Sequence, residues 1–398
     1  MTDNLPPASR QDMPAAIPFW RDPDKLGLIY QAIALSLVLL FGYYIFSNTQ
    51  ANLQRQSIAT GFGFLGSEAG FEIGESLIDY SAADSYLRAL GVGVLNTLKV
   101  SIIGIVFTIL LGIIVGVSRL SSNWLVSRLA AIYIEVLQNI PILLQLFFWY
   151  AIFHDQLPLP RLSMNPMPGI FVNNRGFYYP IPESHPVYFW MGVALLAAIC
   201  AGYLLRRWSK ARQDRTGQYF PAVTVSIGLA LVLPLATWLA GGAPTALDIP
   251  KLSGFNFRGG QSFSPEFGAL LLGLVLYTSA FVAEIVRSGI QAISKGQTEA
   301  AMSLGLSAGR ILTLVILPQA LRVIIPPLTS QMLNLTKNSS LAVAIGFPDF
   351  VSVANTTINQ TGQAIEGVAL IMVVYLFISL VTSAFMNWYN KKKALVER

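Results

Sequence analysis

The chain has 398 residues, of which 54% are hydrophobic and only 12% are charged, and its mean hydropathy is +0.58. A water-soluble domain has no use for so much apolar surface, so this composition excludes an ordinary soluble protein and predicts an all-α integral membrane protein. The net charge of +6 does not indicate nucleic-acid binding, because the basic residues cluster in particular loops, as orienting charges do.

Eight segments are long and apolar enough to cross the hydrocarbon layer as helices of about 20 residues. They cover residues 28–47, 94–117, 129–153, 187–205, 221–240, 267–286, 321–346 and 367–388. With the N-terminus in the cytoplasm, 18 of the 26 Lys and Arg residues fall on the cytoplasmic side, six fall outside, and Lys99 and Lys337 lie within spans. Lys and Arg accumulate in cytoplasmic loops, so this distribution predicts that both termini are cytoplasmic.

Between the first two spans, residues 48–92 form a hydrophilic segment that is too long for a simple turn and carries most of its charge as acid. We expect it on the outer side, either as a loop with a short helix on the membrane surface or as a docking face for a soluble partner. In the second span, Gly112 and Gly116 have a spacing that allows another helix to approach closely. Lys99, near the outer end of that span, is expected to snorkel to the interface.

The third span combines polar side chains with a proline. Glu135, Gln138 and Gln145 are spaced to share one face of a continuous helix. Pro141 is expected to kink this helix and to free backbone carbonyls that need new partners. The polar face is typical either of a wet path or of hydrogen bonding between neighbouring helices.

Residues 154–266 differ in composition from their surroundings. Proline-rich outer segments bracket two apolar spans, which are joined by the basic loop at 206–215. Since these two spans contain almost no polar side chains, we expect an insertion that faces lipid and lies outside any transport path.

A hydrophilic stretch at 295–318 lies between the sixth and seventh spans, on the predicted cytoplasmic side. Good helix formers run up to Gly305, which is expected to end a first helix, and Ser307 is expected to cap a second helix that continues to about Leu317. Pro318 then marks the return to the membrane. Such a short rigid helix suits the groove of a partner, although an unattached amphipathic loop helix has the same pattern.

The seventh span carries a polar stripe formed by Gln331, Asn334, Lys337 and Asn338. A lysine at this depth is expected to find an anion or a cluster of carbonyls. The stripe suggests a lining role, with packing between helices as the alternative. Glu284 in the sixth span is either a counter-charge or the partner of Arg287, three residues along.

Catalytic chemistry is not indicated. His154 and His185 are the only histidines, both in outer loops beside proline, and Cys200 is the only cysteine. The sequence also contains no phosphate-binding loop of the form GxxxxGK[ST]. We therefore expect no cofactor or metal on this chain, and any nucleotide that drives it is hydrolysed by another chain.

The cytoplasmic stretch resembles the signature loop of binding-protein-dependent ABC importer permeases of the polar amino acid class, which have a MetI-like core. The pattern appears as Glu299-Ala300-Ala301, then Gly305, then an Ile-Leu-Pro tail at 316–318. The resemblance implies that this loop is the coupling helix that docks on a cytoplasmic ATPase subunit, and the matching positions are Glu299, Ala300, Ala301 and Gly305.

The likeness extends to residues 91–150 and 267–388, including NTLKVS at 96–101 and KNSSL at 337–341. Gln138 departs from the pattern, since many relatives have arginine there. The long form with an insertion is similar to the first permease subunit of general L-amino acid (Aap/Bzt-type) transporters. It implies a type I importer core of five helices, one additional N-terminal helix and a two-helix insertion.

The resemblance implies a division of the chain into seven regions. These are a cytoplasmic tail at 1–27, a first span at 28–47, a periplasmic segment at 48–92, an N-terminal core region at 93–153, the insertion at 154–266, a C-terminal core region at 267–389 with its coupling loop at 287–320, and a basic tail at 390–398.

The implied function is that of a permease subunit in an ATP-driven importer for L-amino acids in the bacterial inner membrane. The implied partners are a second, similar permease, two ATPase subunits that bind ATP and Mg²⁺, a periplasmic amino-acid-binding protein and membrane lipid, without nucleic acid. Candidate residues for the translocation path are Glu135, Gln138, Asn139, Gln145, Gln331, Asn334, Lys337, Asn338 and Ser339. The alternatives are an ion-gradient-driven transporter that uses Lys337 and Glu284, and a membrane scaffold or sensor.

Overall fold

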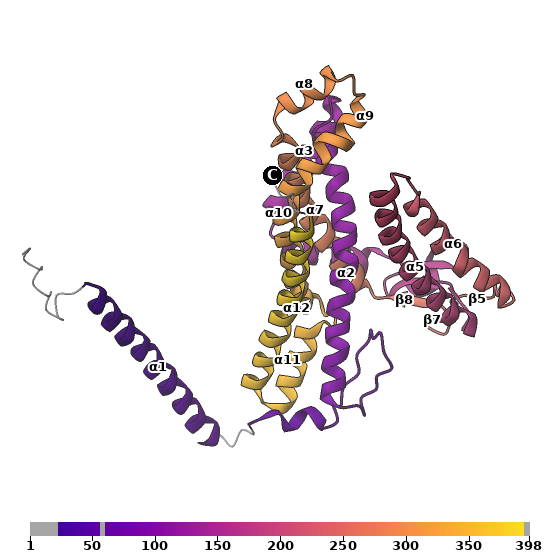
Figure 1. Ribbon diagram of the computed structural model, residues 1–398. Coiled ribbons are helices and arrows are strands. Elements are labelled where there is room, and N and C mark those ends of the chain that lie inside the picture. The colour runs from indigo at the N-terminus through magenta and orange to yellow at the C-terminus, as the bar shows by residue number, and fades with distance from the viewer. Residues whose placement is uncertain (1–22, 56–59, 394–398) are drawn as a thin grey trace, which may run out of the picture.

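The computed structural model describes residues 23–55 and 60–393 (Figure 1). The predicted tails at 1–27 and 390–398 lie largely outside this range. Within it, seven helices are long and apolar enough to cross a membrane, and one bent pair of helices makes an eighth candidate span. The predicted helical membrane fold is therefore confirmed.

Most helices extend beyond the predicted spans. The long helices are α1 (Pro23–Arg55), α2 (Tyr86–Arg119), α5 (Pro186–Thr216), α6 (Ala222–Ala240), α7 (Pro265–Gln291), α10 (Leu317–Asn338) and α12 (Ala364–Lys393). The third predicted span is divided into α3 (Trp124–Asn139) and α4 (Ile142–Ala151). The short helices are α8 (Lys295–Ser303), α9 (Ala308–Ile311) and α11 (Phe350–Thr361).

Helices α2 and α7 lie against each other at the centre of the bundle. A Cβ added at Gly112 would clash with Val282 Cγ1, and one added at Gly116 would lie 2.6 Å from the carbonyl oxygen of Ala283. No side chain fits at either position, so the two glycines allow the close approach that their spacing predicts.

One of the buried clusters lies where the broken third span meets the bundle. Its members come from α2, α4, α7, α10 and the 3₁₀ segment η6 (Ser339–Ile345), and they include Val100, Leu146, Leu270, Leu274 and Leu335. The second half of the broken third span therefore belongs to the core.

The outer segment at 60–85 packs on the bundle and begins with the 3₁₀ turn η2 (Phe62–Gly66). Lys99 was expected to snorkel, but its Nζ lies 2.5 Å from Glu75 Oε1. Glu75 Oε2 also accepts a hydrogen bond from Ser264 Oγ, the N-cap of α7, at 2.8 Å. The ammonium of Lys99 therefore has a carboxylate partner in the folded segment, which the snorkelling prediction did not include.

The insertion contains short antiparallel strands that were expected only as loops. They are β1 (Met164–Met167), β2 (Ile170–Asn173), β3 (Gly176–Tyr179), β4 (Ile181–Pro182), β5 (Leu247–Asp248), β6 (Lys251–Ser253), β7 (Asn256–Arg258) and β8 (Gln261–Phe263). β1, β2, β3 and β8 form one sheet, in which Phe177 pairs with Phe263. Strand β8 follows the inserted helices and β3 precedes them, so this pairing closes the insertion at its base.

Three short helical turns connect these elements. They are η3 (Ile152–Gln156), which follows α4, η4 (Pro160–Leu162), which precedes β1, and η5 (Leu312–Ile316), which joins α9 to α10.

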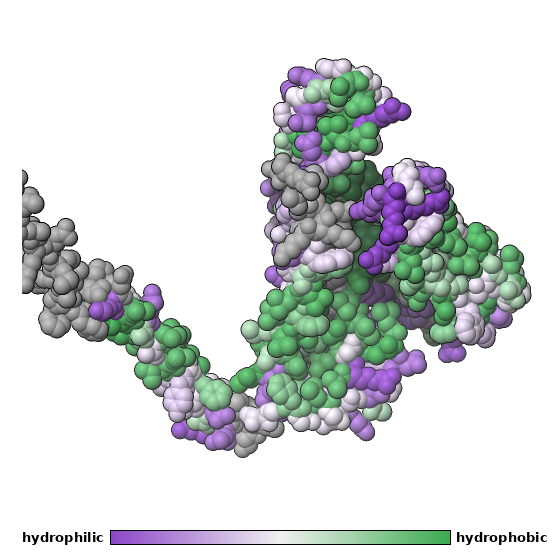
Figure 2. All heavy atoms as spheres, viewed as in Figure 1, coloured by the Kyte–Doolittle hydropathy of each residue, from purple (hydrophilic) through white to green (hydrophobic). Residues whose placement is uncertain are grey.

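The inserted helices α5 and α6 form a hairpin, which is drawn to the right of α2 in Figure 1. A Cβ added at Gly202 would lie 3.0 Å from Ser226 Cβ, and Ser226 Oγ donates to the carbonyl oxygen of Gly202 at 3.3 Å. The two helices thus pack closely on each other. Their remaining sides expose large apolar residues, as Figure 2 shows.

Candidate functional site

The predicted coupling loop folds as a short helix with a defined stop. Gly305 has a φ of +74°, in the left-handed region that favours glycine. Its N–H donates to Met302 O at 2.9 Å, and the N–H of Leu306 donates to Ala301 O at 3.3 Å. This pair of bonds is a Schellman motif, so the predicted end of the helix at Gly305 is confirmed.

The side chains of α8 divide between an inner and an outer face. Ala301 is only 4% exposed, whereas Glu299 and Ala300 face solvent. Met302 is 59% exposed and Leu304 is 81% exposed, and both are large apolar residues on an otherwise hydrophilic tip. Neither was among the predicted residues, although two such side chains in a polar stretch are a usable sign of a docking surface.

The second half of the loop continues into α10 without a break. Helix α9 passes into the π-helical turn η5 and then into α10, and the N–H of Leu317 donates to Leu312 O, five residues back. The expectation that the second helix ends near Leu317 is therefore wrong, because the wider turn joins the two helices.

The third span is broken at Pro141, where the helices on either side meet at 103°. Gln145, which is buried, donates from Nε2 to Leu137 O at 2.9 Å and to Ile140 O at 3.0 Å. The predicted kink and the predicted need for new carbonyl partners are both confirmed. The shared face of Glu135, Gln138 and Gln145 is not formed, because Gln145 lies beyond the break.

Helix α3 is tied to α7 by polar side chains. Gln138 Nε2 donates to Ala280 O at 3.2 Å, and Tyr133 Oη lies 2.7 Å from Ser279 Oγ. Asn139 donates back to Glu135 O within α3 at 2.6 Å, and both residues are exposed. Of the predicted residues in this span, Glu135 and Asn139 are thus accessible. Gln138 and Gln145 instead donate hydrogen bonds to backbone carbonyls and stabilise the fold.

The predicted polar stripe on α10 is only partly buried. Asn334 and Lys337 are exposed, Gln331 and Asn338 are half-buried, and Ser339 is buried with its Oγ donating to Thr336 O at 2.7 Å.

Lys337 makes no ion pair among the residues that the structure describes, so the expectation of an anion or carbonyl cluster is not met within this subunit. A cavity of about 460 Å³ beside it is lined by Ser340, Tyr375, Ser379 and apolar side chains. Glu284 is paired with Arg287, whose Nε donates to Glu284 Oε2 at 2.9 Å, and it is not the counter-charge of Lys337.

A buried carboxyl next to this cavity was not predicted. Asp349 is the N-cap of α11 and accepts from the N–H of Ser352 at 2.9 Å, while Tyr375 Oη donates to it at 3.3 Å. Burial raises the pKa of Asp349 to about 7. The N–H of Phe350 donates to Thr97 Oγ1 at 3.0 Å, so this cap joins α2, α11 and α12.

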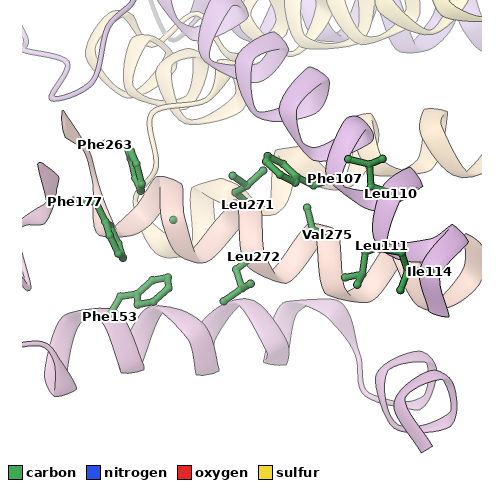
Figure 3. Close-up of a pocket in the computed structure, with 11 residues that line it drawn as sticks. Phe107, Leu110, Leu111, Ile114, Phe153, Phe177, Phe263, Leu271, Leu272 and Val275 are labelled. Atoms are coloured by element: carbon green, nitrogen blue, oxygen red, sulfur yellow. The ribbon is translucent and has the colours of Figure 1, made fainter. Parts of the chain in front are cut away.

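An apolar groove of about 490 Å³ runs along α2 and α7, with Phe177 and Phe263 of the insertion's sheet at one end (Figure 3). Every residue that lines it is apolar, including Phe107, Phe153, Phe177, Phe263 and Leu271. A zwitterionic ligand finds no hydrogen-bonding partner among these side chains. The groove therefore lies outside a path for amino acids and suits hydrocarbon.

Known proteins resemble this chain over nearly its whole length. The general L-amino acid transport system permease protein AapQ of Rhizobium johnstonii is 48% identical over 377 residues, which cover 95% of this chain and 94% of the relative. The putative amino-acid ABC transporter permease protein YhdX of Escherichia coli is 49% identical and covers 95% and 96%. The glutamate/glutamine/aspartate/asparagine transport system permease protein BztB of Rhodobacter capsulatus is 40% identical and covers 95% and 99%.

A family model described as "Binding-protein-dependent transport system inner membrane component" matches residues 108–394, which include the broken span, the predicted coupling loop and the polar stripe. On the strength of this match and of the full-length relatives, the chain belongs to the family of inner membrane components of binding-protein-dependent transport systems.

Proposed function

We propose that this chain is a permease subunit of an ATP-driven ABC importer for L-amino acids. The observation that carries the proposal is 48% identity, over 95% of the chain, to a permease named for general L-amino acid transport. Family membership confirms the predicted resemblance. The relatives are named as permease proteins rather than enzymes, and their ABC type does not favour the ion-gradient alternative.

The substrate class follows from the names of two relatives. One is named for L-amino acids in general and one for glutamate, glutamine, aspartate and asparagine. We propose that this importer likewise accepts several L-amino acids.

The coupling role is supported by the shape of α8. Glu299 and Ala300 face solvent beside the exposed apolar pair Met302 and Leu304, and the Schellman motif at Gly305 fixes the direction of the helix. An apolar tip on a rigid helix suits a groove on an ATPase subunit. Since α9 is continuous with α10, movement of the docked loop would change the position of the polar stripe.

The translocation path is proposed to run along the exposed polar residues. Lys337 and Glu135 have no ion-pair partner within the described residues, and an unpaired charge in a membrane is costly. We place these side chains, with Asn334 and Asn139, toward a second permease subunit. The Lys337 ammonium would contact the carboxylate of the substrate as it passes.

The family description implies an inner-membrane protein that works with a binding protein and an ATPase. The finer assignments belong to the proposal: a second homologous permease, two ATPase subunits that carry ATP and Mg²⁺, a periplasmic amino-acid-binding protein, and cytoplasmic termini. The core regions at 93–153 and 267–389 would form the path, and the insertion at 154–266 would stay outside it.

Uptake into proteoliposomes tests the proposal. The complex of this chain with its second permease and ATPase subunits should accumulate radiolabelled L-glutamate only when binding protein is outside and ATP is inside. Uptake that needs an ion gradient and continues without the ATPase would favour the secondary-transporter alternative and overturn the proposal.

A further inference from the structure

We propose that the cytoplasmic end of α5 is a binding site for the headgroups of anionic phospholipids, which anchors the α5–α6 hairpin in the inner leaflet. This site is separate from the coupling loop and from the proposed path. The insertion has no role in the proposed transport path, and lipid binding would give it a function of its own.

The charge at this end of α5 is dense and unneutralised. Five basic residues and one acidic residue, Asp214, fall within ten positions. The basic residues are Arg206, Arg207, Lys210, Arg212 and Arg215. All of them are exposed except Arg212, which is half-buried, and none forms an ion pair among the residues that the structure describes.

The cluster begins where the apolar body of the hairpin ends. The apolar run at 187–205 has 19 residues and rises about 28 Å, close to the ~30 Å thickness of the hydrocarbon layer. Ser209 Oγ donates to Phe220 O at 3.2 Å, directly before α6 begins at Ala222, so the apolar run of α6 starts at the same level. The first cations of the cluster therefore lie at the depth of the headgroups.

Aromatic rings hold the guanidinium groups at this level. Arg207 lies 5.7 Å from the ring centre of Tyr203, and Arg212 lies 5.3 Å from that of Trp208. Trp208 in turn meets Phe220 edge to face at 5.4 Å. Tyr and Trp favour the interface, and a planar guanidinium matches the geometry of a phosphate, so the site is organised for headgroups.

The surroundings of the hairpin favour lipid over protein. Apolar side chains such as Leu196, Leu204 and Leu231 are exposed along both helices. Figure 2 shows hydrophilic residues gathered at the tip of the hairpin, directly above its hydrophobic body. In Figure 1 this tip stops short of α8 and α9, where an ATPase subunit would dock.

The test uses the purified full chain and native mass spectrometry, with phosphatidylglycerol and phosphatidylcholine as probes. Wild-type protein should retain phosphatidylglycerol in preference to phosphatidylcholine. The variant Arg206→Gln/Arg207→Gln/Lys210→Gln/Arg212→Gln should lose at least about tenfold in affinity for phosphatidylglycerol, because each basic residue near an anionic surface adds to binding.

The matched control is Arg161→Gln/Arg175→Gln/Lys251→Gln/Arg258→Gln, which removes four cations from the opposite end of the same insertion and should leave binding unchanged. Replacing Arg206, Arg207 and Arg212 by lysine keeps the charge and should preserve most of the binding, which shows that the loss in the quadruple variant comes from lost charge. Size-exclusion profiles of all three variants report on folding.

Three results would overturn the proposal: equal retention of both lipids by wild type, an equal loss in the control, or unchanged phosphatidylglycerol binding in the quadruple variant. If that variant kept its lipid but no longer assembled with the co-expressed ATPase subunit, the cluster would belong to a protein interface. None of these measurements involves uptake, so the lipid site and the proposed transport function are tested independently.

Discussion

At the scale of single residues, the two lysines within the predicted spans have different surroundings. Lys99 is satisfied inside the chain by Glu75, whereas Lys337 is left exposed beside a cavity. Both are lysines within predicted spans, and their local sequences do not tell them apart. The difference comes from which distant segment folds over each ammonium.

The Lys99–Glu75 pair gives a direct test of the outer segment. Lys99→Met leaves a largely buried carboxylate without its counter-charge, which costs about 3–5 kcal/mol, and should lower the thermal unfolding midpoint of the purified chain. The double variant Lys99→Met/Glu75→Gln removes both charges and should recover much of the loss. A single variant as stable as wild type would show that the segment is not held by this pair.

Asp349 predicts a pH dependence. Its pKa in the folded chain, about 7, lies above the ordinary value of 3.8, so folding favours the protonated form. The resulting stabilisation is fully present below pH 3.8 and is lost as the pH rises through about 7. Wild type should therefore unfold at a higher temperature at pH 5 than at pH 8. Asp349→Asn should flatten this difference, and an unchanged slope in the variant would contradict the assignment.

At the scale of helices, the predicted coupling loop depends on one backbone conformation. An added Cβ at Gly305 meets nothing within 4 Å, so replacing this glycine by alanine costs only the strain of the left-handed φ, about 1–2 kcal/mol. That is enough to disturb the Schellman motif and the direction of α8.

Gly305→Ala should therefore reduce ATP-driven uptake several-fold while the protein still inserts and assembles. Gly309→Ala is the matched control, because Gly309 lies in α9 at an ordinary helical φ with open space around it, and its uptake should be unchanged. Equal uptake by both variants would argue against a fixed coupling helix.

Hydropathy predicted most of the membrane helices, because a long apolar run identifies a span wherever it packs. The break at Pro141 was predicted only as a kink, since its 103° angle depends on Gln145 capping the freed carbonyls. The β3–β8 sheet was not predicted, because Phe177 and Phe263 pair across the whole inserted hairpin. The signature residues of the coupling loop were found by resemblance, whereas the exposure of Met302 and Leu304 required the folded helix.

At the scale of the whole molecule, three surfaces of the chain fit the partners that we propose. The charges of Glu135 and Lys337 are exposed, the α8 tip carries exposed apolar side chains, and the inserted hairpin ends in a cluster of cations. These three surfaces suit three different neighbours: a second permease, an ATPase and lipid. The bundle of α2, α7 and α10 connects the first two.

The most direct test of ATP coupling through α8 is the uptake of L-amino acid by the reconstituted complex carrying Leu304→Asp. Leu304 is 81% exposed, so the charge should leave the fold intact while removing the apolar contact with the ATPase. ATP-dependent uptake should fall at least about tenfold, with normal amounts of this chain in the membrane. Undiminished ATP-dependent uptake by this variant would contradict the coupling role of α8.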